Sequence, residues 1–190
     1  MNLIYDYLFL TMWIAWGLYW IISARGVKTP IRSESTLSRW AHYGPLTFAG
    51  WLLSDGGRIG WPLRTPFMSR SVTSFWISAA VTAIGLLLTI WARQHLGRNW
   101  SGTVTVKEDH TLIRSGPYRL VRHPIYSGML LALLGTALAI GSARGFIGAG
   151  LILFGFLLKL QVEEARMRET FPAEYDDYCR HTARLVPGVF

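Results

Sequence analysis

Long apolar runs separated by polar connections divide this chain into candidate membrane helices. A spanning helix needs about 20 predominantly apolar residues, and the runs at residues 3–23 and 72–92 reach this length. Two shorter runs, at residues 125–140 and 146–161, are separated by the turn-like sequence Gly-Ser-Ala-Arg-Gly. A fifth run, at residues 40–53, is short and contains Gly-Pro, so it predicts either a further span or a re-entrant segment. The pattern therefore predicts an all-α integral membrane protein with about five transmembrane helices.

The basic residues are distributed unevenly between these runs, which predicts an orientation. Connections on one side of the predicted membrane carry 15 Lys and Arg residues, and those on the other side carry 4. Because cytosolic connections are enriched in these residues, we expect the N-terminus outside and the C-terminus in the cytosol. Residues 1–92 then hold three N-terminal spans, and residues 93–190 hold a helical hairpin at 125–161 and a polar cytosolic tail. The compact length and the lack of a recognisable targeting signal favour a prokaryotic plasma membrane.

The composition supports a lipid bilayer as the main partner. Hydrophobic residues make up 51% of the chain and charged residues 16%, against roughly 25% charged residues in soluble domains. The net charge of +8 is spread between apolar runs, which favours anionic lipid headgroups over nucleic acid as a partner. Cys179 is the single cysteine, so neither an intrachain disulfide nor a cysteine-based metal cluster can form. His42, His95 and His181 have no partner at metal-ligand spacing, and we expect no metal site.

The last two runs predict an antiparallel hairpin that brings together residues 40 positions apart in the sequence. His123 lies 20 residues before the centre of the turn at Ala143, and Glu163 lies 20 residues after it. With a rise of about 1.5 Å per residue in both helices, the two residues return to the same height at the cytosolic boundary. The sequence around His123 is thus predicted to face Glu163 and Glu164.

These residues suit a ligand with separate charged groups. Pro124 fits the first turn of a helix, where its missing N–H is not needed, and the backbone N–H groups of that turn favour a carboxylate. Glu163 and Glu164 follow the last apolar run, at an expected helix C-terminus whose dipole disfavours negative charge, so they predict a cationic partner. Lys159, one turn earlier, offers a simpler partner through an i, i+4 ion pair.

A ligand with an ammonium group, a carboxylate and a flat heteroaromatic ring would satisfy this arrangement. The acidic side chains would hold the ammonium and the helix start would hold the carboxylate, while Leu112, Tyr118 or Tyr126 would line the ring pocket. S-adenosylmethionine has all three parts, together with a sulfonium group that acidic surroundings tolerate. We therefore expect a cytosolic cofactor pocket formed by the C-terminal half of the chain.

An ordered series of short motifs surrounds the predicted hairpin. It comprises His110-Thr111-Leu112-Ile113, Ser115-Gly116-Pro117-Tyr118, Arg122-His123-Pro124-Ile125-Tyr126-Ser127-Gly128, Glu163-Glu164, Phe171-Pro172-Ala173-Glu174-Tyr175-Asp176-Asp177-Tyr178 and Arg184-Leu185-Val186-Pro187. On these motifs, over about residues 97–187, the chain resembles the isoprenylcysteine carboxyl methyltransferases and the related membrane phospholipid methyltransferases. The first 70 residues match only in being hydrophobic spans.

The resemblance implies a site for S-adenosylmethionine. The residues that it assigns to this cofactor are His110, Thr111, Leu112, Ile113, Tyr118, His123, Pro124, Ile125, Tyr126 and Glu163, the first four in a strand-like segment. In the carboxyl methyltransferases an arginine one turn before the acidic residue contacts the substrate carboxylate, and Lys159 occupies that place here. Lysine keeps the charge but lacks the planar fork that binds a carboxylate through two N–H groups, so the substrate stays open at this point.

The sequence leads us to expect a membrane methyltransferase that acts on a lipid-like or prenylated substrate, with O-methylation of a carboxylate favoured. An amine, such as a phospholipid headgroup, is the alternative acceptor, and His123 or Glu164 would then take its proton. The family shares its C-terminal pattern with membrane sterol reductases that bind NADPH, which gives a second alternative. A non-catalytic membrane scaffold is the third.

The polar tail is expected to return to the helices. Phe171, Tyr175 and Tyr178 recur at helical spacing, which predicts that their rings pack against the membrane helices. Arg180 and Arg184 are expected either to bind a lipid phosphate or to fix the tail in place.

Overall fold

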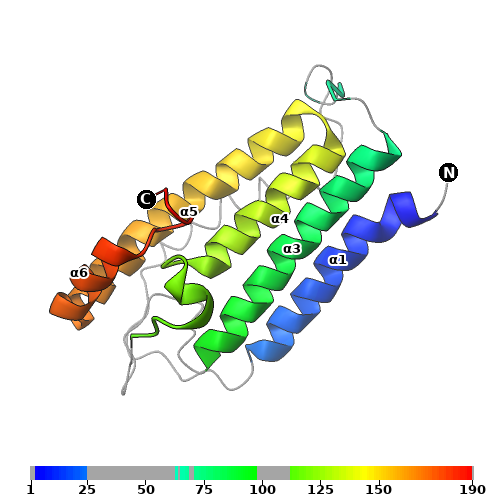
Figure 1. Ribbon diagram of the computed structural model, residues 1–190. Coiled ribbons are helices and arrows are strands. Elements are labelled where there is room, and N and C mark those ends of the chain that lie inside the picture. Colours follow the sequence, from blue (N-terminus) through cyan, green and yellow to red (C-terminus); the bar gives the residue numbers. More distant parts are fainter. Residues whose placement is uncertain (1–2, 25–62, 64, 69–70, 98–111, 190) are drawn as a thin grey trace, which may run out of the picture.

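Four long helices lie side by side in the computed structural model, in the order α1, α3, α4 and α5, and the short helix α6 follows at one end of α5 (Figure 1). The structure describes residues 3–24, 63, 65–68, 71–97 and 112–189. The elements are α1 (Leu3–Ser23), α3 (Val72–Leu96), the 3-10 helix η2 (Gly116–Arg119), α4 (Pro124–Ile140), α5 (Ala143–Thr170) and α6 (Pro172–His181).

The described helices agree with the all-α prediction. By length and composition, α3 and α5 can each cross a membrane, while Tyr7–Ser23 in α1 and Pro124–Ile140 in α4 are shorter apolar stretches. The run at residues 40–53 lies outside the described residues, as do His42, His110 and Thr111. The number of five spans therefore stays a prediction.

Helix α5 is longer than the apolar run that predicts it. It spans 28 residues, from Ala143 to Thr170, because its charged continuation is rich in good helix formers such as Glu, Ala, Arg and Met. Glu163 and Glu164 consequently lie inside the helix, and the prediction that they stand at its C-terminus is wrong. Their negative charge is offset by side chains of α5 itself and of other segments, and the dipole at the end of the helix is not what decides their partners.

Helices α3 and α4 approach closely because glycines line their contact. A Cβ atom at Gly85 would lie 2.3 Å from the backbone N of Ala132, and one at Gly135 would lie 2.6 Å from the backbone N of Thr82. A Cβ atom at Gly128 would likewise lie 2.6 Å from the carbonyl oxygen of Gly85. Small residues allow such backbone contacts in membrane helices, where packing and polar contacts hold the helices together. These glycines thus set the position of α4 relative to α3.

Two tryptophans attach α1 to the same pair of helices. The indole N–H of Trp13 donates to the hydroxyl of Thr136 in α4 at 3.1 Å, and that of Trp16 donates to the hydroxyl of Thr89 in α3 at 2.6 Å. Each hydrogen bond satisfies a polar group that an apolar environment would otherwise leave without a partner.

The turn between α4 and α5 is shorter than the sequence suggests. In this turn Gly141 takes a left-handed conformation, with φ of 63°, and ends α4, as glycine does at many helix C-termini. Helix α5 then begins at Ala143, so the connection has two residues. The segment near Phe67 covers this turn, since its N–H donates to the carbonyl of Gly141 at 3.0 Å.

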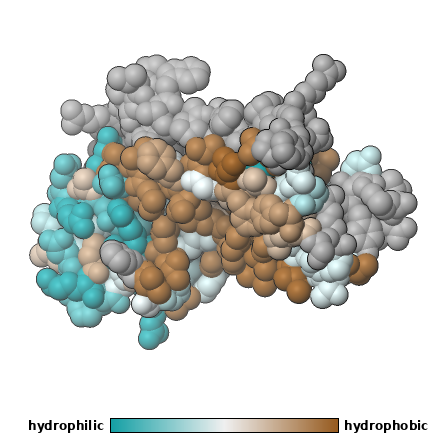
Figure 2. Space-filling view, turned by 90° about the horizontal axis from the view of Figure 1, so that it is seen from above, coloured by the Kyte–Doolittle hydropathy of each residue, from teal (hydrophilic) through white to brown (hydrophobic). Residues whose placement is uncertain are grey.

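Apolar side chains cover the middle of the face shown in Figure 2, and hydrophilic ones gather at the end that carries α6. Large apolar side chains that are exposed include Leu10, Ile14, Leu18, Trp76, Leu87 and Trp91. In a soluble protein so many exposed apolar groups on two helices would be unfavourable, whereas lipid tails solvate them. The polar end is the one at which α4 begins and α5 continues beyond its apolar stretch.

Candidate functional site

A turn before α4 places His123 at the polar end of the hairpin. Pro124 is the first residue of the helix and is buried, and His123 precedes it without making a side-chain capping bond. The backbone N–H groups of Arg122 and His123 donate to the carbonyls of Ala183 and Arg184, at 2.8 and 3.1 Å. The C-terminal tail therefore lies directly along this turn, where Val121 and Ala183 also form a parallel bridge.

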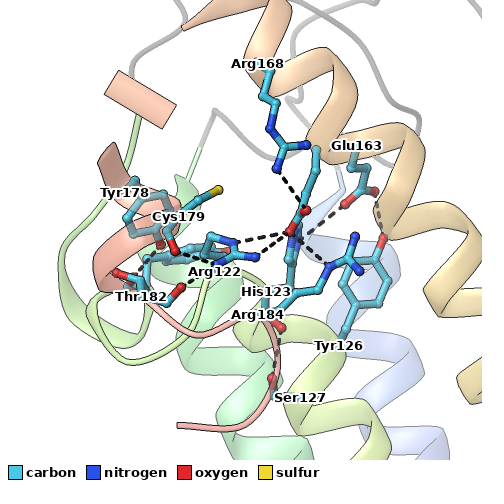
Figure 3. A network of polar contacts seen from close by, with 12 residues as sticks. Arg122, His123, Tyr126, Ser127, Glu163, Arg168, Tyr178, Cys179, Thr182 and Arg184 are labelled. Atoms are coloured by element: carbon cyan, nitrogen blue, oxygen red, sulfur yellow. Dashed lines mark hydrogen bonds and ion pairs between the residues drawn. The ribbon is translucent and has the colours of Figure 1, made fainter. Parts of the chain in front are cut away.

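Glu164 lies at the centre of the site and is buried, with 4% of its surface exposed. One of its oxygens, Oε1, accepts bonds from Arg122 at 3.1 and 3.2 Å and from Arg184 at 3.1 Å. The same oxygen lies 3.2 Å from Nε2 of His123, and Arg168 approaches the other oxygen at 3.9 Å. Figure 3 shows Arg122, His123, Arg168 and Arg184 converging from the turn before α4, α5 and the tail. Several cationic groups thus stabilise one buried carboxylate.

Glu163 has different surroundings from its neighbour. Its side chain is more accessible, at 23% exposure. The hydroxyl of Tyr126 donates to it at 2.7 Å, and Nδ1 of His123 lies 3.8 Å from its second oxygen. The equal distances from the hairpin turn therefore do bring His123 and Glu163 together, as the spacing predicts. Sequence position alone does not show that the two carboxylates face different partners.

Lys159 lies one turn before Glu163, and its ammonium is 3.9 Å from the carboxylate. The same ammonium lies 5.9 Å from the centre of the Tyr126 ring, within the range of a cation–π contact. The simpler i, i+4 pair is therefore present. The role of Lys159 toward a substrate stays a prediction.

Tyr118 and His95 form an aromatic pair beside this cluster. Their rings stack with a centroid distance of 6.4 Å, and Nε2 of His95 lies 2.8 Å from the hydroxyl of Ser115. Gly116 makes room for the imidazole, because a Cβ atom there would lie 2.6 Å from it. Burial raises the pKa of Tyr118, and the carboxylate of Glu163 adds to this effect, so its phenol stays protonated.

The tail packs as the aromatic spacing predicts at two of its three positions, whereas Phe171 is only partly buried. Tyr175 and Tyr178 of α6 are buried, and the hydroxyl of Tyr178 donates to the carbonyl of Tyr118. Of the two arginines with an open role, Arg184 reaches Glu164 and so fixes the tail, whereas Arg180 is exposed and pairs with its neighbour in α6.

Several site residues could not be assigned from sequence. Arg122, Arg168 and Arg184 surround Glu164, yet their positions in the sequence give no sign of a shared partner. Leu112 and Ile113 lie in a segment without regular structure, so the strand-like form expected for them is not seen, and His110 and Thr111 lie outside the described residues. Within the part of the chain that the structure describes, no group of three metal-ligating side chains is found.

The fold and the site together define a class of helical membrane protein in which a polar site lies at one end of an apolar helical hairpin. The chain belongs to the phospholipid methyltransferase (PEMT) family, whose model matches residues 73–174. The match covers α3 to the start of α6, and with it the hairpin and both glutamates. The resemblance read from the short motifs is thereby confirmed, and the chain is an integral membrane protein.

Individual relatives fall into two named groups. A probable protein-S-isoprenylcysteine O-methyltransferase of Oryza sativa subsp. indica is 30% identical over 60% of this chain and 61% of its own length. The protein-S-isoprenylcysteine O-methyltransferase of Dictyostelium discoideum is 24% identical over 63% of this chain and 52% of its own. The nickel-cobalt-cadmium resistance protein NccN of Alcaligenes xylosoxydans xylosoxydans is 29% identical over 59% of this chain and 52% of its own. The chain thus matches between about half and three fifths of each relative.

A solved structure shares the fold. The eukaryotic intramembrane Ras methyltransferase ICMT (isoprenylcysteine carboxyl methyltransferase) aligns with a TM-score of 0.53 over 84% of this chain and 55% of that chain, at 19% sequence identity. The likeness shows that the arrangement of helices is similar, and residue roles have to be argued from this chain.

Proposed function

We propose that this protein is a membrane methyltransferase that uses S-adenosylmethionine and modifies a lipid-like or prenylated substrate at the cytosolic side. The observation that carries the proposal is the difference between the two adjacent carboxylates. Glu164 is neutralised within the protein, whereas Glu163 is the more accessible and lies beside the aromatic ring of Tyr126. Although the Lys159 ammonium lies 3.9 Å from it, this accessible carboxylate beside an aromatic ring suits the ammonium of the cofactor.

The residues around Glu163 fit the other parts of S-adenosylmethionine. The first turn of α4 has no side-chain cap, so the N-terminus of this helix is suited to a carboxylate. Tyr118 and the segment with Leu112 and Ile113 would border the ring, together with His110 and Thr111 of the preceding sequence. When bound, the cofactor supplies an activated methyl group on its sulfonium.

The protein's own part in the reaction is to align the reactants and to exclude water. Tyr126 orients the carboxylate of Glu163 through its hydroxyl. A carboxylate acceptor, which we favour, needs no base, and Lys159 would attract it at the membrane boundary. An amine acceptor has to lose a proton. For that step His123 is better placed than Glu164, whose Oε1 already accepts bonds from two arginines.

The amine acceptor is the second candidate function, because the family that the chain belongs to is described as phospholipid methyltransferase. The two candidates differ in the substrate and share the cofactor site. Comparing methyl transfer from labelled S-adenosylmethionine to a prenylcysteine analogue and to a phosphatidylethanolamine vesicle would separate them.

Equilibrium binding of labelled S-adenosylmethionine to the purified full chain tests the site. We expect Glu163→Gln to weaken binding by roughly tenfold or more, since a hydrogen bond to a charged group contributes about 1.5–3 kcal/mol. Glu169→Gln is the matched control, because Glu169 is an exposed carboxylate of the same helix. Unchanged affinity in the Glu163 variant would show that the ammonium is held elsewhere.

A further inference from the structure

Glu164 joins three segments that are far apart in the sequence. Arg122 and His123 precede α4, Glu164 belongs to α5, and Arg184 belongs to the tail. The side chain of Glu164 is 5% exposed, and those of Arg122 and His123 are each 10% exposed. Removing one partner of such a buried group leaves the others with charge that the protein no longer balances, which is strongly unfavourable.

The tail contacts the same turn through its backbone. The N–H groups of Arg122 and His123 donate to the carbonyls of Ala183 and Arg184, and the hydroxyl of Ser127 donates to the carbonyl of Leu185. Arg122 also reaches back to the carbonyl of Thr182, just after the end of α6. The tail therefore depends on side-chain and backbone contacts that meet within a few residues of His123 (Figure 3).

We propose that Glu164 is a positioning residue that acts through Arg184. Together they clamp tail residues 182–185 onto the turn at Arg122 and His123, and this clamp holds His123 beside Glu163. Glu164 then affects cofactor affinity without touching the cofactor. The last point rests on the proposed function, whereas the clamp itself rests only on the contacts described above.

The two roles of the adjacent carboxylates follow from helix geometry. Consecutive residues of a helix point about 100° apart, so Glu163 and Glu164 cannot both face the same ligand from the same direction. Glu164 faces the turn and the tail, where arginines from three segments meet it. Glu163 faces Tyr126 and Lys159.

Hydrogen–deuterium exchange of the full chain in detergent tests the clamp directly. The backbone amides of Arg122 and His123 are the groups that the tail carbonyls protect. We expect Arg184→Ala and Glu164→Gln each to raise their exchange rate about tenfold or more. Arg184→Lys, which keeps the charge, should restore most of the protection. Arg180→Ala is the matched control, because Arg180 is exposed and pairs with Asp177, one turn earlier in α6.

Two comparisons make the role of Glu164 specific. The double variant Glu164→Gln/Arg184→Ala should exchange no faster than the faster single variant, since the two residues act through one contact. Binding of S-adenosylhomocysteine should weaken about tenfold in both single variants and recover in Arg184→Lys. Exchange in residues 143–161 serves as the measure of the intact hairpin, and if Glu164→Gln unfolds it, Arg184→Ala and Arg184→Lys carry the test.

Several outcomes would overturn the clamp. One is unchanged exchange at Arg122 and His123 in Arg184→Ala. Another is loss of ligand binding in Glu164→Gln with both amides still protected, which would mean that Glu164 acts on the cofactor or on His123 directly and not through the tail. If the unmodified protein binds no S-adenosylhomocysteine, the proposed function fails, and the exchange rates alone decide whether the clamp exists.

Discussion

At the scale of single residues, the adjacent carboxylates of Glu163 and Glu164 have different surroundings because consecutive helix residues point in different directions. Glu164 is buried among arginines, and Glu163 accepts a bond from Tyr126 at 2.7 Å while remaining accessible. A buried carboxylate that is already balanced adds little attraction for a ligand cation, whereas an accessible one keeps most of it. The division explains why two adjacent glutamates need not be interchangeable.

Gly116 provides a test of the aromatic pair at the edge of the site. It has φ of 59°, and a Cβ atom there would lie 2.6 Å from the imidazole of His95. We expect Gly116→Ala to lower the free energy of unfolding by about 1–2 kcal/mol from the left-handed backbone alone, and by more because the imidazole must move. Thermal unfolding in detergent measures this change.

Gly188→Ala is the control for that substitution. Gly188 also has a positive φ, of 73°, but nothing lies within 4 Å of the added Cβ atom. If the two variants lose equal stability, the contact between Gly116 and His95 contributes nothing beyond backbone strain.

The sequence predicts the pairing of His123 with Glu163 because two helices of equal rise return to the same height. It does not predict the partners of Glu164, because Arg184 reaches it from a tail whose path is set by long-range contacts. The helix dipole does not determine the partners of Glu163 and Glu164, for a local reason. Residues 162–170 continue the helix, so the end of the apolar run is not the end of α5.

At the scale of elements, the contact between α3 and α4 determines where the turn at His123 stands. The backbones meet at Gly85, Gly128 and Gly135, and small residues are enriched where membrane helices contact each other. Hydrophobic runs predict that these two helices exist. They do not show which faces meet, because in lipid both buried and exposed faces are apolar.

Gly85→Ala tests this contact. Its Cβ atom would lie 2.3 Å from a backbone atom of Ala132, so the helices have to separate, and we expect a loss of about 1–3 kcal/mol or more in unfolding free energy. Gly150→Ala in α5 meets open space and should be neutral or slightly stabilising, because alanine favours helix. Equal unfolding midpoints for both variants would contradict the close contact.

At the scale of the whole molecule, the orientation in the membrane is a prediction that can be tested. The segments that form the site carry most of the basic residues, and because such segments are generally retained in the cytosol, we propose that the site faces the cytosol. A green fluorescent protein fused to the C-terminus should fluoresce in bacterial cells, and alkaline phosphatase fused there should be inactive. The reverse pattern would place the site outside and exclude a cytosolic cofactor.

The most direct measurement for the central claim is thermal unfolding of the purified protein with S-adenosylhomocysteine and with NADPH, side by side. A ligand at 100 times its Kd stabilises the native state by about 2.7 kcal/mol. We predict a clear rise in Tm with S-adenosylhomocysteine and none with NADPH. A rise with NADPH alone would indicate a reductase, and no rise with either ligand would contradict a methyltransferase site between Glu163 and the start of α4.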